Sequence, residues 1–212
     1  MPHEILLFLF VLIGYAVGCL QAAYFVGRKF GKIDIREHGS GNAGMTNVAR
    51  VMGAKAGAVV LLLDTAKAVA AIMLANYVFY GRVYGMEGIE YLPGLLTGLG
   101  VILGHNFPFY LKFRGGKGIA CTLGLALMFD WRVMAIAIGV TFFTLVFSKY
   151  MSLASLLGLI TLGLTTTLLF NDLPVIFAMW AIAALGFFTH RKNIVRLIKG
   201  EENKFSIKKR KK

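Results

Sequence analysis

Long hydrophobic runs separated by short polar segments make up most of this 212-residue chain. The first run, residues 5–26, carries no charged side chain. About 20 helical residues, with a rise of about 1.5 Å each, cross the roughly 30 Å hydrocarbon core of a bilayer. The runs cover residues 5–26, 56–80, 92–107, 118–129, 133–148, 151–170 and 173–190. The pattern therefore predicts an all-α, polytopic integral membrane protein with about seven transmembrane helices, of which 118–129 is the shortest.

Composition agrees with a single membrane-embedded domain over residues 1–212 that ends in a basic tail, residues 199–212. Hydrophobic residues make up 58% of the chain, charged residues 16%, and the mean hydropathy is +0.71, which is too apolar for a soluble domain. The formal net charge is +13, but the basic residues lie between apolar runs, so we expect no nucleic-acid partner. Cys19 and Cys121 lie inside apolar runs without metal-type spacing, which predicts buried thiols.

Lysine and arginine residues set the predicted orientation, because cytosolic loops of membrane proteins are enriched in them. Twenty of the 23 fall on the face that carries residues 28–55. Only Arg82 and Arg132 fall on the opposite face, and Lys67 lies within a span. We therefore expect residues 28–55 and the C-terminus in the cytosol, with the N-terminus and the loop 81–90 outside. An odd number of spans satisfies this arrangement.

A polar, glycine-rich stretch, Gly39–Arg50, follows the first apolar run. Its glycines permit turns whose successive N–H groups form a concave anion site. Its polar side chains are Ser40, Asn42, Thr46, Asn47 and Arg50. The glycine spacing also matches a dinucleotide-binding fingerprint, but a membrane helix precedes it where that fingerprint requires a strand. We interpret the stretch as an anion site for a phosphate-bearing substrate, with a flexible solvated loop as the alternative.

A second stretch, Gly115-Gly116-Lys117-Gly118, is predicted on the same membrane face. Small neighbours let a phosphate approach the backbone, and the lysine supplies a positive charge. His105 lies just upstream, where a structural and a catalytic role are equally open.

Two further pairs have helical spacing. His190 and Asn193 are three residues apart, so they share a face if the last helix extends that far, level with both glycine stretches. We favour a role in the site over an interfacial histidine and a helix cap. Asp64 and Lys67 are also three apart inside a span. Charges inside a membrane suggest function, but this spacing favours a mutually neutralising structural pair.

Several signatures of other chemistries are missing from the sequence. There is no His-x4-Asp acyltransferase signature and no Gly-x-Ser-x-Gly nucleophile elbow. No cytosolic cluster of Asp, Glu, His or Cys resembles a metal site. We therefore expect neither a metal nor a cofactor, and we disfavour metal-dependent phosphoryl or nucleotidyl transfer.

The motifs resemble those of the bacterial acyl-phosphate:glycerol-3-phosphate acyltransferases, and the resemblance covers nearly the whole chain. The segments that carry it are Gly39–Arg50, Gly104–Pro108, Gly115–Gly118 and His190–Ile194. The tail Lys208–Lys212 extends past the usual end of the family, which we interpret as either an anionic-lipid contact or a lineage-specific feature. The family's last motif is visible only in part, in Gly200-Glu201-Glu202, to which we assign no role.

The resemblance implies a multi-pass enzyme of the bacterial cytoplasmic (inner) membrane, with its active site facing the cytosol. It implies acyl transfer from acyl phosphate to sn-glycerol 3-phosphate, giving lysophosphatidic acid and phosphate, the first step of phospholipid synthesis. The implied partners are these substrates and membrane lipids, and a monomer is expected. The implied catalytic residues are Ser40, Arg50, Lys117 and His105. The implied substrate-binding residues are Gly41, Asn42, Gly44, Thr46, Asn47, Gly115, Gly116, His190 and Asn193.

An acyl phosphate is already an activated mixed anhydride, so positioning and electrostatics can supply much of the catalysis. Neither glycine stretch contains a carboxylate that could act as base. We hypothesise that a phosphate oxygen of the acyl phosphate accepts the hydroxyl proton, without a metal and without an acyl-enzyme. A transporter or flippase for a phosphorylated solute or lipid is the alternative function, and a metal-dependent phosphatidyl-alcohol transferase would need clustered Asp residues that are absent.

Overall fold

The computed structural model describes residues 3–80 and 91–205, and this part of the chain is helical without a strand, as predicted. The predicted outer loop 81–90 and the end of the basic tail lie outside the described residues. The α-helices are α1 (His3–Gly18), α2 (Ala22–Val26), α3 (Met45–Met52), α4 (Ala54–Tyr80), α5 (Leu92–Asn106), α6 (Ile119–Phe129), α7 (Trp131–Ser148), α8 (Met151–Leu169) and α9 (Leu173–Ile198). Shorter helical turns are η1 (Gly27–Gly31), η2 (Ile35–Glu37) and η3 (Phe109–Leu111).

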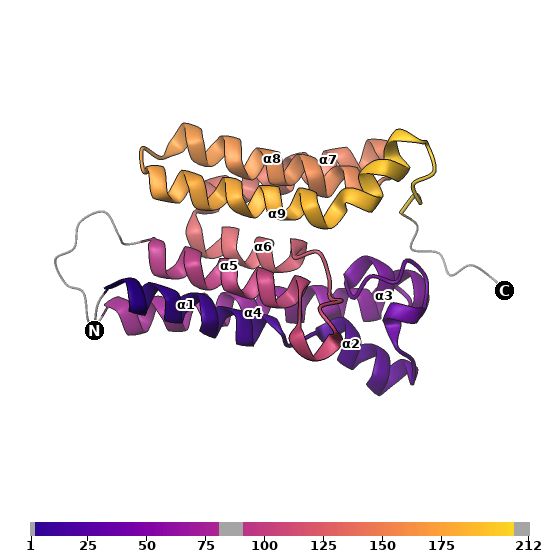
Figure 1. The fold of residues 1–212 in the computed structure, drawn as a ribbon. Helices are drawn as coiled ribbons and strands as arrows, with labels where there is room; N and C mark the ends of the chain where they lie inside the picture. The colour runs from indigo at the N-terminus through magenta and orange to yellow at the C-terminus, as the bar shows by residue number, and fades with distance from the viewer. Residues whose placement is uncertain (1–2, 81–90, 206–212) are drawn as a thin grey trace.

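The long helices lie side by side in one bundle (Figure 1). Helices α1, α4, α5 and α6 form one part, and α7, α8 and α9 pack over α5 and α6 as the other. Helices α2 and α3 lie at one end of the bundle, together with the end of α9 (Figure 1). The start of α1 lies at the opposite end (Figure 1).

Five helical segments of the described chain are long and apolar enough to cross a membrane. They are Leu7–Gly31, Ala54–Val78, Trp131–Ser148, Met151–Leu169 and Leu173–Ile198. The two other predicted spans correspond to α5 and α6, which have only 15 and 11 residues. The chain is thus an all-helical membrane protein with five full-length candidate spans and two shorter helices between them.

The first predicted span is broken, which the sequence analysis did not foresee. Helix α1 ends at Gly18 and α2 begins at Ala22, so the carbonyl groups at the break lack helical partners. Lys67 Nζ donates to the carbonyl oxygens of Gly18 (3.1 Å) and Leu20 (2.6 Å), and the Tyr110 hydroxyl donates to that of Cys19 (2.8 Å). Side chains from other elements therefore supply the bonds that a break at membrane depth requires.

Helices α1 and α5 are in direct backbone contact through four glycines. A Cβ atom at Gly14 or Gly18 would lie 2.2 Å from the carbonyl oxygen of Thr97 or Val101 on α5. Reciprocally, a Cβ at Gly100 or Gly104 would lie 2.2 or 2.1 Å from a carbonyl oxygen of α1. Small residues spaced four apart allow this close approach of membrane helices. The contact fixes the end of α5, from which His105 and the second glycine stretch follow.

Candidate functional site

The two glycine-rich stretches meet at the polar end of the bundle. The N–H of Ala43 in the first donates to the carbonyl oxygen of Gly115 in the second, at 3.4 Å. A Cβ atom on Gly116 would lie 2.8 Å from the carbonyl oxygen of Ala43. The structure therefore brings together two motifs that are far apart in the sequence, as the predicted topology requires.

Asn47 organises the first stretch from beneath. Its side chain is buried, and its Oδ1 accepts the N–H of Ser40 at 2.8 Å. Its Nδ2 donates to the carbonyl oxygens of Ile35 (3.0 Å) and His38 (2.9 Å). The amide is thus used by the loop itself, whereas the Ser40 side chain is exposed.

Helix α3 begins inside the first stretch. Gly44 is its N-cap and contributes no side-chain cap, and the carbonyl oxygen of Gly44 accepts the N–H of Asn47 at 3.1 Å. The N–H groups of Met45 and Thr46 precede the first bonded amide, at the end of the helix where anions bind. Thr46 and Arg50 are four residues apart on this helix and share a face. Arg50 is exposed and makes no ion pair among the described residues. Asn42 is half-buried beside Gly44.

Arg36, held by a bidentate ion pair to Asp34 in its own segment, joins the segments that lead into the two stretches. Arg36 Nη2 and Nε donate to the Asp34 carboxylate at 2.7 and 3.0 Å, and Arg36 Nη1 donates to the carbonyl oxygen of Leu111 at 3.0 Å. Hydrogen bonds from Arg36 lower the pKa of the Asp34 carboxyl below its usual value. A polar cavity of about 250 Å³ lies against this pair and is also lined by Lys112 and Arg114.

Lys117 connects the second stretch to α9 and to the segment after it. Its ammonium donates to Asn193 Oδ1, and Asn193 Nδ2 donates to Glu202 Oε1 at 2.7 Å. Glu202 also accepts from Ser152 Oγ (3.0 Å) and from Arg196 Nε (2.7 Å). A continuous chain of hydrogen bonds therefore runs from Glu202, after the end of α9, through Asn193 to Lys117 in the second glycine stretch.

Burial determines the charge state of this polar chain. Burial lowers the pKa of Lys117 to about 8. The positive charges of Arg196 and Arg50 also lower this pKa, whereas the negative charge of Glu202 raises it. Burial alone would raise the pKa of the Glu202 carboxyl, but hydrogen bonds from Arg196, Asn193 and Ser152 lower it overall. Lys117 is thus a partly desolvated cation beside the two glycine stretches.

Glu202 is the site residue to which the sequence analysis assigned no role. Helix α9 ends at Ile198, and Gly200 adopts φ +71°, a left-handed conformation that turns the chain back. That turn brings Glu202 against Asn193 and Arg196. The helix-ending glycine followed by two carboxylates was the available signal, because glycine in this conformation commonly ends a helix.

His190 and Asn193 lie on one helix, as their spacing required, and both are buried. His190 Nδ1 lies 2.8 Å from the carbonyl oxygen of Gly186. Because a carbonyl only accepts, Nδ1 carries the proton and Nε2 is the acceptor nitrogen.

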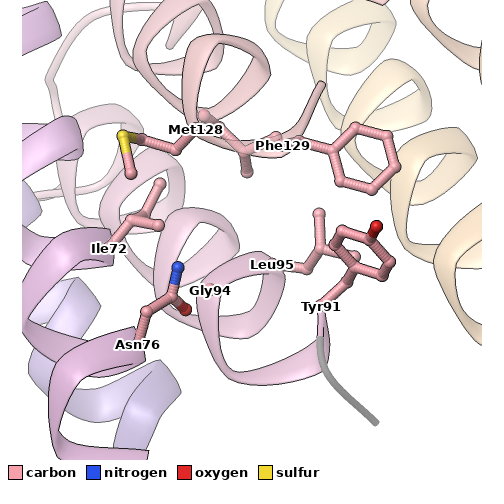
Figure 2. Close-up of a pocket in the computed structure, with 8 residues that line it drawn as sticks. Ile72, Asn76, Tyr91, Gly94, Leu95, Met128 and Phe129 are labelled. Atoms are coloured by element: carbon pink, nitrogen blue, oxygen red, sulfur yellow. The ribbon is translucent and has the colours of Figure 1, made fainter. Parts of the chain in front are cut away.

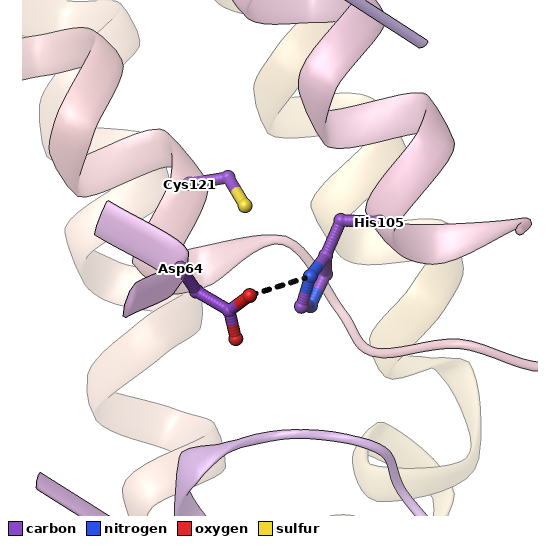
Figure 3. Close-up of side chains that lie close together, drawn as sticks. All are labelled: Asp64, His105 and Cys121. Atoms are coloured by element: carbon purple, nitrogen blue, oxygen red, sulfur yellow. Dashed lines mark ion pairs between the residues drawn. The ribbon is translucent and has the colours of Figure 1, made fainter. Parts of the chain in front are cut away.

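His105 lies below the second stretch with a buried ring. The side chains of Asp64, His105 and Cys121 point toward one another from α4, α5 and α6 (Figure 3). The atoms with which they could bind a metal lie within 4.8 Å of one another. The sequence analysis did not foresee this buried group. Lys67 Nζ lies 2.8 Å from Asp64 Oδ1 and 3.1 Å from His105 Nδ1, so an ammonium already contacts two of the three side chains in this group. The predicted Asp64–Lys67 ion pair is confirmed, and both cysteines are buried thiols.

A family model for glycerol-3-phosphate acyltransferases matches residues 8–200 of the chain. The protein from Thermoanaerobacter pseudethanolicus with that name is 41% identical over 199 residues, covering 93% of this chain and 94% of the relative. This chain belongs to the glycerol-3-phosphate acyltransferase family. A family member from Listeria monocytogenes is 38% identical over 198 residues, covering 93% of this chain and 96% of the relative.

Two solved structures of the integral membrane glycerol 3-phosphate acyltransferase PlsY (YgiH) have the same fold. Its glycerol 3-phosphate form gives a TM-score of 0.84 at 32% identity, covering 94% of this chain and 96% of that one. Its lysophosphatidic acid form gives a TM-score of 0.81 at 32% identity, covering 95% and 96%. The resemblance stated from the motifs is therefore confirmed at the level of family and fold.

The acyltransferase fold also contains a cavity away from the glycine stretches. Figure 2 shows this space of about 150 Å³ between α4, α5 and α6. Ile72, Tyr91, Leu95 and Phe129 contribute apolar lining, and Asn76 is its polar side chain. It lies beside the start of α5, about 15 Å along that helix from His105 at a rise of about 1.5 Å per residue. We therefore place the polar site at the glycine stretches and not here.

Proposed function

We propose that this protein transfers a fatty acyl group from acyl phosphate to sn-glycerol 3-phosphate, giving lysophosphatidic acid and phosphate. One observation carries the proposal: Lys117, held by Asn193, lies where the two glycine stretches meet, in a chain of the glycerol-3-phosphate acyltransferase family. The reaction would be the first step of phospholipid synthesis.

Each substrate contains a phosphate group, and the site offers separate cations for them. Lys117 supplies a point charge beside the second stretch. Arg50 on α3 supplies a guanidinium that has no ion-pair partner in the part of the chain that the structure describes. The hydroxyl of Ser40 and the open N–H groups at the start of α3 add neutral donors. These groups can hold two anions side by side, which brings the acceptor hydroxyl next to the acyl carbonyl.

In the proposed step, the hydroxyl oxygen of glycerol 3-phosphate attacks the acyl carbonyl carbon and forms the ester bond. The bond between that carbon and the phosphate oxygen breaks, and phosphate leaves. Phosphate oxygens titrate near pH 6, so the departing phosphate can take the hydroxyl proton itself. Lys117 and Arg50 offset the developing charge. No metal and no acylated enzyme enter this scheme.

The first experiment mixes purified protein in detergent with palmitoyl phosphate and glycerol 3-phosphate in EDTA. We expect lysophosphatidic acid and phosphate in equal amounts. Absence of turnover would contradict the proposal, and transport in liposomes without turnover would favour a transporter. An acylated enzyme trapped by mass spectrometry would exclude direct transfer.

The same assay tests for a protein base through His190→Ala. We expect a loss well below the roughly thousandfold that removal of an essential base can cause, because general acid–base catalysis contributes about 10²–10⁴-fold. A loss of that full size in kcat, rescued by imidazole, would assign the proton transfer to the protein.

We further propose seven spans in a bacterial cytoplasmic membrane, with α5 and α6 as short crossings and both glycine stretches in the cytosol. Three features support this topology. The described chain starts and ends at opposite ends of the bundle, both stretches lie at the end where α9 ends, and basic residues concentrate there.

Cysteine labelling in whole cells tests this orientation. In a background with Cys19→Ala and Cys121→Ala, we expect an impermeant thiol reagent to label Trp131→Cys but not Lys32→Cys. Both positions are exposed, so access to the side chain is matched. The reverse labelling pattern would overturn the orientation.

A further inference from the structure

A buried charged cluster lies directly beneath the second glycine stretch. It consists of Asp64 and Lys67 on α4 and His105 on α5. The side chains of Asp64 and His105 are 1% and 3% exposed, and that of Lys67 is 9% exposed. Buried charges in a membrane are costly, and a neutralising pair alone would not need a third polar group or a fixed geometry.

The ammonium of Lys67 joins three parts of the bundle. It lies 2.8 Å from Asp64 Oδ1 and 3.1 Å from His105 Nδ1, and it donates to the carbonyl oxygens of Gly18 and Leu20 at the break between α1 and α2. Asp64 Oδ1 is also 3.5 Å from His105 Nδ1. The ammonium is thus held by two donated hydrogen bonds, an ion pair and a contact with the imidazole, which come from three different elements.

His105 in turn holds the glycine stretch from two sides. Its carbonyl oxygen accepts the N–H of Gly116 at 3.0 Å and Nε2 of Gln21 at 2.6 Å. Its ring lies against the same glycine, because a Cβ on Gly116 would be 2.0 Å from His105 Nε2. The next residue is Lys117. The imidazole that contacts Lys67 and Asp64 therefore lies directly against the residue that precedes Lys117.

We propose that Asp64 and Lys67 are positioning residues for acyl transfer: they lock the His105 imidazole under Gly116 and so hold the Lys117 ammonium at its phosphate. This inference rests on the proposed function of the site. It assigns His105 a supporting role, since its ring nitrogens face the cluster and the loop backbone. A shift of about 1 Å in a positioned group can cost about a hundredfold in rate, so a support of this kind has a measurable effect.

The deciding variant is the double substitution Asp64→Asn/Lys67→Met, which removes both charges together and leaves no unpaired charge in the membrane. We expect kcat/KM for glycerol 3-phosphate to fall by about tenfold or more. We also expect the alkaline limb of the pH profile of kcat/KM, which Lys117 sets, to move to higher pH. The reason is that a displaced Lys117 becomes more solvated, and its pKa then rises toward the usual value. If Asp64 and Lys67 only neutralise each other, kcat/KM of the double variant should stay within about threefold of wild type, and the alkaline limb of its pH profile should not move. That result would overturn the inference.

A second variant decides the case in which the double variant fails to fold. His105→Asn keeps a polar atom near the Nδ1 position, and so the contact to Lys67, but removes the ring from beneath Gly116. We expect a loss of about tenfold or more in kcat/KM with the melting temperature nearly retained. A fully active His105→Asn protein would overturn the inference.

Thr97→Val is the matched control, because Thr97 lies on α5, the same helix as His105. Its hydroxyl is fully buried and has no hydrogen-bond partner among the described residues. It should leave kcat/KM unchanged. The wild-type arm separates this test from that of the proposed function: a wild type that makes no lysophosphatidic acid refutes the function, whereas an active wild type with equally active variants refutes only the positioning role.

Discussion

Alanine in place of Lys117 should lower kcat/KM for glycerol 3-phosphate by roughly ten- to more than hundredfold, because a charge-assisted hydrogen bond contributes about 1.5–3 kcal/mol. The substitution removes the ammonium that Asn193 holds between the glycine stretches. Arg50→Ala should cause a similar loss, since Arg50 supplies the other cation. Steady-state kinetics of the purified variants in detergent measure both effects.

The pH dependence distinguishes the charge of Lys117 from its bulk. Its pKa lies at about 8, below the usual 10.5, so the ammonium is present below pH 8 and is lost as the pH rises through that value. The wild type should therefore lose kcat/KM above about pH 8. A bound phosphate stabilises the ammonium, so the limb in kcat at saturating substrate should lie higher.

Lys117→Arg is the matched variant, because a guanidinium stays protonated throughout this range. It should retain part of the activity and lack the alkaline limb. The titration of Lys117 does not itself unfold the protein over this range. Between pH 8 and 10.5 the unfolded chain binds a proton at Lys117 that the folded chain does not. The contribution of this group to the free energy of unfolding therefore rises with pH between those values. Wild-type kinetics in Lys117→Ala would remove the residue from the site.

The local features of the site were readable from the sequence because each one occupies a short stretch. Three glycines among hydrogen-bonding side chains indicated an anion site between Gly39 and Arg50, and the distribution of lysine and arginine placed the second stretch and His190 at the same end. The structure brings these segments together. It also gives Asn47 a task that composition does not reveal, because the choice between loop support and ligand contact depends on where the buried amide points.

What the sequence did not predict depends on contacts between distant segments. The break after Gly18 has no proline or charge to mark it, and it is stable because Lys67 and Tyr110 reach it from other elements. Asp64, His105 and Cys121 meet only because three helices pack together. The contact between α1 and α5 did have a readable signal, since glycines spaced four apart on two predicted spans indicate close helix packing.

A single methyl group on Gly116 should inactivate the protein almost completely. In Gly116→Ala the new Cβ would lie 2.0 Å from His105 Nε2 and 2.8 Å from the carbonyl oxygen of Ala43. The ring cannot retreat, because Lys67 and Asp64 surround its other nitrogen, and the carbonyl belongs to the first glycine stretch. The loop must move instead and carry Lys117 with it. A displacement of about 1 Å predicts a loss of about a hundredfold or more in kcat/KM.

Gly139→Ala is the control for this substitution. It adds the same methyl group in α7, where no described atom outside the adjacent residues and the backbone of that helix lies within 4 Å of the new Cβ. Alanine also favours a helix over glycine by about 1 kcal/mol. This variant should keep its activity and melt at the same or a higher temperature. Binding of inorganic phosphate, followed by the shift in melting temperature, should be weakened in Gly116→Ala and unchanged in Gly139→Ala. If Gly116→Ala kept both its turnover and its phosphate shift, the two glycine stretches would not form one rigid site, and Lys117 would reach its phosphate from a mobile loop.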